Sequence, residues 1–284
     1  MKNALTIDLE DYYQVTAFAN DSRGNWDSHA SRVEANTERL LDLLAAAKRN
    51  ATFFALGWVG EKYPRLIRKV ADCGHEIACH SHLHRLVYSL TPSEFREDTR
   101  RAKEVLEQAG GVAVRGYRAP SFSITRDSHW ALEILVELGF SYDSSIFPVK
   151  HLNYGMPDGP RFPFRIHTAA GPIVEFPMPT LAVGDVRSPF GGGAYFRLLP
   201  YRYTRWGIQY LNQVTGQPAC VYLHPWEIDT EQPRMSGSIT ARARHYFGLS
   251  RTEAKLRRLL VDVDFCTLGA LIPQLDLPEG TLSH

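Results

Sequence analysis

The chain has 284 residues, of which 44% are hydrophobic and 22% are charged, a composition typical of a globular protein with one large core. The formal net charge is +1 and the lysines and arginines are scattered, which argues against binding to nucleic acids or other polyanions. No apolar segment approaches the roughly 20 residues that span a bilayer, and no signal peptide is visible, so we expect a cytoplasmic protein without a transmembrane segment. The four cysteines form no CxxC pair, which indicates buried free thiols.

Short apolar segments alternate with amphipathic stretches from residue 4 to residue 223. The predicted strands are residues 4–8, 51–56, 76–80, 115–119, 140–143, 173–176 and 219–223. The predicted helices are residues 32–49, 63–73, 91–108 and 127–138. This alternation predicts a parallel sheet with helices outside it, and about seven strands favour a closed or nearly closed α/β barrel.

Two segments fall outside this alternation. Residues 146–200 are rich in proline, glycine and aromatic residues, so we predict a long loop excursion over one mouth of the barrel. Residues 228–284 contain one clear helical pattern, at 251–260, and are predicted to form a short helical extension packed on the barrel. The predicted organisation is therefore a barrel domain at 1–227 and a C-terminal extension at 228–284.

Polar side chains follow the predicted strands at the points where the strands end. They are Asp8, Glu10 and Asp11 after the first strand, His80, His82 and His84 after the third, Arg118 after the fourth, Asp143 after the fifth and His224 after the last. The carboxyl ends of parallel strands converge on one mouth of a barrel, where active sites lie. We therefore expect these side chains to form a single site.

The histidines are the first candidates for metal ligands. His80 and His84 are four residues apart, a spacing that lets both imidazoles face one point from a helical turn or a tight loop. Together with a carboxylate they form a two-histidine, one-carboxylate site with positions open for water and substrate, whereas His82 is expected to point away. Asp8 and Glu10 share one face of an extended segment, and a divalent cation would offset the cost of grouping acids there. One acid is then free to act as a general base.

The remaining polar residues suggest how an amide would be hydrolysed. Arg118 is expected to hold a carboxylate in its ionised form, and the turn after it would aim the backbone amides of Ser121 and Phe122 at a developing oxyanion. His224 suits a general acid for a leaving amine, with Asp143 holding its other ring nitrogen.

Five motifs read TIDLED at residues 6–11, HSHLH at 80–84, RAP at 118–120, DSS at 143–145 and LH at 223–224. In this order they resemble the motifs of the NodB-homology polysaccharide deacetylases, carbohydrate esterase family four, over about residues 1–227. The sequences DLEDYY at 8–13, GGGAYFRLLP at 191–200 and HPWEID at 224–229 resemble a narrower branch that is associated with exopolysaccharide loci of the exosortase type.

The resemblance implies a distorted (β/α) barrel and a set of roles. Asp8 would be the base, Arg118 would orient it, His80 and His84 would bind the metal, and His224 would be the acid. The implied cofactor is a divalent metal ion, with zinc as the first expectation and cobalt or nickel as alternatives.

One departure from the family pattern concerns the third protein ligand of the metal. The family places two aspartates side by side, whereas Leu9 follows Asp8 in this sequence. The ligand is then Glu10, which shares the face of Asp8, or Asp11, which has the shorter side chain usual in the family. Both stay candidates, and the shared face favours Glu10.

The implied reaction removes N-acetyl groups from an N-acetylhexosamine-containing polysaccharide or its precursor, in exopolysaccharide biosynthesis. The alternatives are an allantoinase-like hydrolase of cyclic amides and a non-catalytic sugar-binding relative. Tyr195, Arg197 and Trp226 are candidate contacts to the saccharide. A cytoplasmic enzyme would act on a precursor or lipid-linked sugar beside the polysaccharide-synthesis machinery at the membrane face, and the sequence leaves the oligomeric state open.

Overall fold

The sheet is formed by short apolar segments that helices and loops cover. The computed structural model describes residues 1–18, 24–151, 154–184, 186–280 and 282. Its strands are β1 (Asn3–Leu9), β2 (Thr52–Ala55), β3 (Glu76–Cys79), β4 (Gly116–Tyr117), β5 (Tyr142–Asp143), β6 (Phe164–Thr168), β7 (Gly171–Glu175), β8 (Thr180–Val183), β9 (Val186–Pro189), β10 (Cys220–Leu223), β11 (Phe265–Cys266) and β12 (Glu279–Gly280). Neighbouring strands in the order β10-β1-β2-β3-β4-β5-β7 are all parallel, as the alternating pattern predicted.

The strand order describes an incomplete barrel. On the far side of β7, strand β6 pairs antiparallel and β12 follows it. Within the described residues no pairing joins β12 back to β10, so the sheet is not closed by backbone hydrogen bonds. The predicted α/β fold with a distorted barrel of mostly parallel strands is confirmed.

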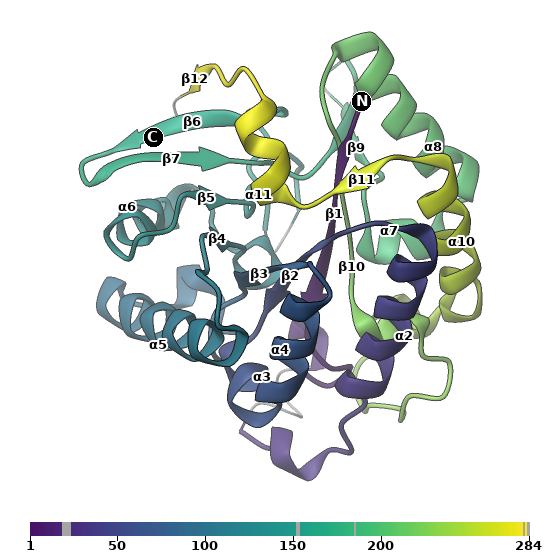
Figure 1. Cartoon of the computed structure of the whole chain (residues 1–284). Helices are drawn as coiled ribbons and strands as arrows, with labels where there is room; N and C mark the ends of the chain where they lie inside the picture. Colours follow the sequence, from purple (N-terminus) through teal and green to yellow (C-terminus); the bar gives the residue numbers. More distant parts are fainter. Residues whose placement is uncertain (19–23, 152–153, 185, 281, 283–284) are drawn as a thin grey trace.

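Helices cover the outside of this sheet (Figure 1). They are α2 (Val33–Ala47), α3 (Gly57–Lys62), α4 (Pro64–Asp72), α5 (Pro92–Gly110), α6 (Trp130–Glu137), α7 (Gly193–Leu198), α8 (Tyr201–Tyr210), α9 (Ile239–Tyr246), α10 (Leu249–Asp262) and α11 (Leu268–Leu271). Helix α5 shows how the sequence sets a helix start: the Thr91 hydroxyl accepts from the Glu94 amide, and the Glu94 carboxylate accepts from the Thr91 amide. None of the helices in the described parts of the chain is long and apolar enough to cross a bilayer.

Alternation along β1 divides the core from the site. Leu5, Ile7 and Leu9 pack into the apolar cluster between the sheet and its helices. Asp8 lies two residues after Thr6 and therefore shares its face, which is the interior face of the barrel. The strand thus delivers a carboxylate to the interior without interrupting the apolar outer face.

The two segments outside the alternating pattern are more regular than predicted. Residues 146–200 are not one loop, because they contain the antiparallel hairpins β6–β7 and β8–β9 and helix α7. The tail after residue 228 contains α9, α10 and α11, and its strand β11 pairs with β1 while β12 pairs with β6. The tail therefore packs on the sheet and adds strands to it. The predicted boundary between 227 and 228 stays a prediction.

Candidate metal centre and active site

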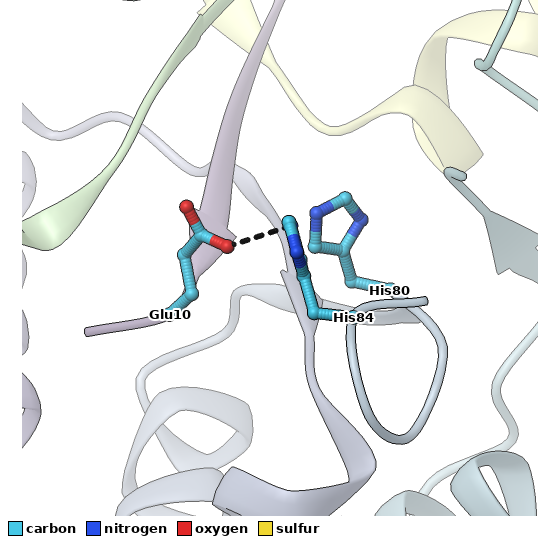
Figure 2. A group of neighbouring side chains, drawn as sticks. All are labelled: Glu10, His80 and His84. Carbon is cyan, nitrogen blue, oxygen red and sulfur yellow. Dashed lines mark ion pairs between the residues drawn. The ribbon is translucent and has the colours of Figure 1, made fainter. Parts of the chain in front are cut away.

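Glu10, His80 and His84 converge at the carboxyl ends of β1 and β3, and we call these three residues the ligand cluster (Figure 2). Glu10 Oε2 lies 2.9 Å from His84 Nε2, and the two imidazole ring centroids are 5.3 Å apart. One nitrogen or oxygen atom from each residue lies within 4.8 Å of the others. All three side chains are buried.

A strained turn after β3 brings the two histidines together. Ser81 and His84 have φ values of 66° and 51°, in the left-handed region that non-glycine residues adopt rarely and at an energetic cost. The Ser81 hydroxyl accepts from the His84 amide at 3.0 Å, which closes the turn. His82 points away, as expected, and its ring packs beside Gly57 at the start of α3, where a Cβ on Gly57 would lie 2.4 Å from His82 Nδ1.

The position of the His80 proton follows from its hydrogen bond. His80 Nδ1 lies 2.8 Å from the carbonyl oxygen of Arg118, which can only accept, so Nδ1 carries the proton and Nε2 keeps its lone pair. Burial lowers the pKa of His80 to about 4. The ring is therefore neutral at pH 7, the state in which imidazole binds metals.

The structure separates the two candidate acids. Asp11 caps the N-terminus of α2, where its carboxylate accepts from the amides of Arg32 at 2.7 Å and Val33 at 3.1 Å and from the Ser31 hydroxyl. Glu10 is the carboxylate that reaches the histidines. Burial alone would raise the pKa of Glu10, but the charges of the neighbouring histidines, His84 first, lower it to about 2.

The ligand cluster suits a divalent metal ion. Glu10 Oε2 is buried and lies 2.9 Å from His84 Nε2, but this contact lacks hydrogen-bond geometry, so within the described residues no donor is directed at the oxygen. A buried carboxylate oxygen without a donor is costly, and a bound cation would remove that cost. Two neutral imidazoles and one carboxylate are a donor set used for zinc and other first-row divalent ions, with positions left open for water and substrate.

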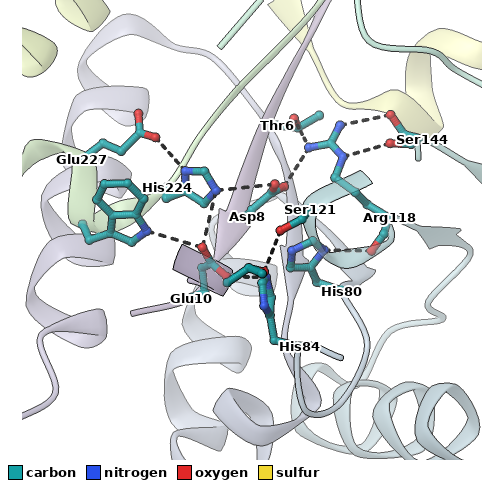
Figure 3. A network of polar contacts seen from close by, with 12 residues as sticks. Thr6, Asp8, Glu10, His80, His84, Arg118, Ser121, Ser144, His224 and Glu227 are labelled. Carbon is teal, nitrogen blue, oxygen red and sulfur yellow. Dashed lines mark hydrogen bonds and ion pairs between the residues drawn. The ribbon is translucent and has the colours of Figure 1, made fainter. Parts of the chain in front are cut away.

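Arg118 holds Asp8 inside the barrel (Figure 3). Its Nη1 lies 2.7 Å from Asp8 Oδ1 and also donates to the Thr6 hydroxyl at 2.7 Å. The other side of the guanidinium donates to the Ser144 hydroxyl at 3.0 Å and to the Ser144 carbonyl at 3.2 Å. The ring of Phe54 lies 4.2 Å from the guanidinium carbon. With each of its nitrogens bonded, the fully buried arginine fixes the Asp8 carboxylate in place.

His224 faces Asp8 of β1 and Glu10 directly after it, but takes its support from a different residue than expected. Its Nε2 lies 3.8 Å from Asp8 Oδ2 and 3.5 Å from Glu10 Oε1. Its Nδ1 lies 2.7 Å from Glu227 Oε1, three residues further along the chain. Burial lowers the pKa of His224, but the hydrogen bond and charge of Glu227 outweigh it and raise the pKa above its ordinary value.

The prediction that Asp143 holds His224 is therefore wrong. Asp143 accepts from the hydroxyl of Ser145 at 2.6 Å and from its amide at 3.2 Å, and so caps its own turn. Pro225 opens a 3-10 helix (Pro225–Ile228) directly after His224, and that turn brings Glu227 back to the imidazole. The sequence did carry this signal, because residues three apart in a helical turn are neighbours.

The site opens into a cavity of about 420 Å³. Its lining includes the ligand cluster, Asp8 and His224, and the predicted saccharide contacts Ser121, Phe122, Arg197 and Trp226. Tyr195 was predicted as a fifth contact but does not line the cavity; its ring lies edge-on to Phe147, at 6.4 Å. The Phe122 amide donates to the Ala119 carbonyl, so the prediction that it faces an oxyanion is also wrong.

The Arg197 side chain is held by contacts within the protein. Its Nη1 lies 2.6 Å from Glu227 Oε1, its Nη2 donates to the backbone carbonyl of Arg244, and its guanidinium lies 5.0 Å from the centre of the Trp226 ring. The Trp226 ring stacks between those of His224 and His245, with centroid distances of 5.0 and 4.1 Å. Arg197 and Trp226 thus form the wall that supports His224 and Glu227.

Comparison with known proteins gives two family matches that divide the chain. Residues 25–142 match the polysaccharide deacetylase family, and residues 144–273 match a domain of unknown function, DUF3473. A segment of 98 residues, 34% of this chain, is 32% identical to a peptidoglycan-N-acetylglucosamine deacetylase of Bacillus cereus. That segment spans 36% of the relative's length, so the likeness concerns a part of each protein.

Solved structures match over nearly the whole chain. A crystal structure described as a putative polysaccharide deacetylase from Mycobacterium smegmatis superposes with a TM-score of 0.66 and 22% identity, covering 99% of this chain and 93% of the other. The Puue allantoinase superposes with a TM-score of 0.57 and 15% identity, covering 98% and 86%. At these identities the superpositions show the shared fold alone. The match over residues 25–142 and the Bacillus cereus relative show that this part of the chain is similar to polysaccharide deacetylases, in agreement with the shared fold.

Proposed function

We propose that the chain is a metal-dependent N-deacetylase that hydrolyses the acetamide of an N-acetylhexosamine unit in a polysaccharide or its precursor. The observation that carries the proposal is the convergence of the ligand cluster, the Asp8–Arg118 pair and the His224–Glu227 pair on one cavity. These are the parts that amide hydrolysis needs: a site for a Lewis acid, a base and an acid.

Glu10, His80 and His84 would hold the metal, which supplies a polarised carbonyl oxygen and a water of lowered pKa. Asp8, fixed by Arg118, accepts the proton of the attacking water. His224, held by Glu227, donates a proton to the nitrogen that leaves. One water is consumed, the C–N bond breaks, and the products are acetate and the free amino sugar.

Two local features support these roles. Arg118 fixes the Asp8 carboxylate at the cavity as a base would need, and Glu227 raises the pKa of His224, which an acid requires. Ser121 has a φ of 50° on the turn after Arg118, and its hydroxyl pairs with that of Thr16 at 2.7 Å. Ser121 lines the cavity, and its backbone amide would stabilise the oxyanion.

The role in exopolysaccharide biosynthesis, with a lipid-linked or free precursor as substrate, is part of the proposal and rests on the motif resemblance. The allantoinase-like alternative shares the fold, but the cavity chemistry favours the deacetylase because the ligand cluster is complete.

The test is an acetate-release screen. The metal-stripped chain is reloaded with zinc, cobalt or nickel and offered N-acetylglucosamine oligosaccharides, lipid-linked N-acetylhexosamines and allantoin. We expect equimolar acetate and free amine from an N-acetylated saccharide, with the stripped chain inactive. Hydrolysis of allantoin without acetate release from any saccharide would overturn the proposal.

A further inference from the structure

The cavity lined by the ligand cluster contains three carboxylates, and two of them are already paired with arginines. The pairs are Asp8 with Arg118 at 2.7 Å and Glu227 with Arg197 at 2.6 Å, whereas Glu10 belongs to the ligand cluster and lies 2.9 Å from His84. Each of these cations is therefore held by the protein itself. A charged group of a ligand would need a different partner.

Arg244 is a cation of the same cavity without such a pair. It lies on α9, its side chain reaches the cavity wall, and Nη2 donates to the Tyr154 hydroxyl at 3.5 Å. Across the parts of the chain that the structure describes, no carboxylate lies within 4.0 Å of its guanidinium. Arg244 is exposed, and an arginine stays protonated at every physiological pH. The positive charge at this end of the cavity is thus not offset.

An aromatic wall runs from His224 to Arg244: the Tyr222 ring lies 5.8 Å from that of His224, and the Tyr154 hydroxyl accepts from Arg244. Phe122, Tyr154 and Tyr222 all line the cavity. The ring centroids of Phe122 and Tyr222 are 5.1 Å apart, and those of Phe122 and Tyr154 are 6.2 Å apart. Aromatic faces offer rigid apolar area on which the C–H face of a sugar ring packs. A saccharide on this wall would reach the ligand cluster at one end and Arg244 at the other.

We propose that Arg244 binds an anionic group, a carboxylate or a phosphate, that the saccharide carries next to its N-acetylated unit. The inference rests on the proposed function and specifies its substrate class: an acidic N-acetylated saccharide rather than a neutral one. The guanidinium fork matches both anions in a bidentate manner. Arg197 cannot take this role, because it is buried and paired with Glu227.

The test measures binding by calorimetry to the zinc-loaded full chain with Asp8→Asn, which prevents turnover. Three ligands of equal length are compared: a neutral N-acetylglucosamine oligosaccharide, one that alternates N-acetylglucosamine with glucuronate, and one that carries a phosphomonoester. We expect about tenfold tighter binding of at least one anionic ligand, which is the value of a charged hydrogen bond. The two anionic arms distinguish a carboxylate from a phosphate.

The variants assign the preference to one residue. Arg244→Gln removes it, Arg244→Lys keeps part of it, and Arg242→Gln, an exposed residue of the same helix that does not line the cavity, leaves it unchanged. Equal affinity for neutral and anionic ligands, or a preference that survives in Arg244→Gln, would overturn the inference. Acetate release by the unmodified chain tests the proposed function separately. If acetate is released from the neutral ligand alone, the proposed deacetylase activity stands and the role of Arg244 is overturned.

Discussion

Glu227 Oε1 lies 2.7 Å from Nδ1 of His224, three residues away on the turn that follows β10. The same carboxylate oxygen lies 2.6 Å from Arg197, so it bridges a buried guanidinium and the imidazole. The imidazole thereby directs Nε2 at Asp8 of β1 and Glu10 directly after it. The first prediction follows from this arrangement.

Replacing Glu227 with glutamine should lower kcat about 10- to 100-fold with little change in KM, because general acid catalysis contributes about 10²- to 10⁴-fold and would be impaired rather than removed. Glu227 raises the pKa of His224, so the basic limb of the pH–rate profile should move to lower pH in the variant. Steady-state acetate release from pH 5 to 10 measures both effects. Glu231→Gln, an exposed acid nearby, is the control. An unshifted profile would remove Glu227 from the mechanism.

Substitutions of Glu10 and Asp11 should distinguish the metal-binding role of the first from the structural role of the second. Glu10→Gln should lose stoichiometric metal while the chain stays folded, because it removes the carboxylate that contacts His84. Asp11→Ala should keep its metal but unfold more easily by about 1 to 2 kcal/mol, the usual value of a helix N-cap. Metal content by mass spectrometry and urea unfolding give the two readouts. If Asp11→Ala loses its metal and Glu10→Gln retains it, then Asp11 and not Glu10 is the metal ligand.

Arg118→Met should destabilise the fold by about 3 to 5 kcal/mol, because it leaves the Asp8 carboxylate buried without its partner. Arg118→Lys keeps the charge but not the fork that serves Asp8 and Ser144 together. We expect that variant to fold and to lose most of kcat. Thermal denaturation and acetate release test the pair, and full activity in Arg118→Lys would show that charge alone suffices.

Acid should destabilise the chain through buried histidines. Burial lowers the pKa of His75 from 6.5 to about 4, and its Nδ1 accepts from the Ala51 amide, so the folded state holds it neutral. The unfolded state binds the proton first, so stability falls as pH drops from 6.5 toward 4. From pH 7 to 5 this histidine should contribute about 1 to 2 kcal/mol of the loss. Urea unfolding of His75→Gln should show a smaller loss than the unmodified chain, whereas exposed His167→Gln should match it.

Much of the site was predictable from the sequence because its residues lie where predicted strands end. The first three strands are short, mostly apolar segments, so their ends placed Asp8, Glu10 and the two ligand histidines correctly near one another. The hairpin β6–β7 was only partly predicted because β6 alternates buried and exposed residues, and its pattern was lost among prolines and glycines. Helix α3 begins at Gly57, a poor helix former that is needed there to make room for His82.

The errors concern side chains whose partners depend on packing. Asp143 ends a strand as predicted, but whether its carboxylate reaches His224 depends on the positions of distant elements. In the structure the carboxylate accepts from Ser145, two residues along the same turn. Arg197 was a candidate contact to the saccharide, yet its buried side chain is paired with Glu227. Gly192 was predicted only to lie in the loop excursion at 146–200. It pairs with Tyr222 on β10, where a Cβ would lie 2.0 Å from the Tyr222 carbonyl oxygen.

The most direct test of the account measures bound zinc and acetate release together in His84→Ala, with His82→Gln as the matched control. His84 belongs to the ligand cluster, whereas His82 lies two residues away and points to α3. We predict that His84→Ala loses both its zinc and its acetate release and that His82→Gln retains one zinc per chain and its turnover. A His84→Ala chain that still binds one zinc, or that still releases acetate at the original rate, would contradict a deacetylase built on this cluster.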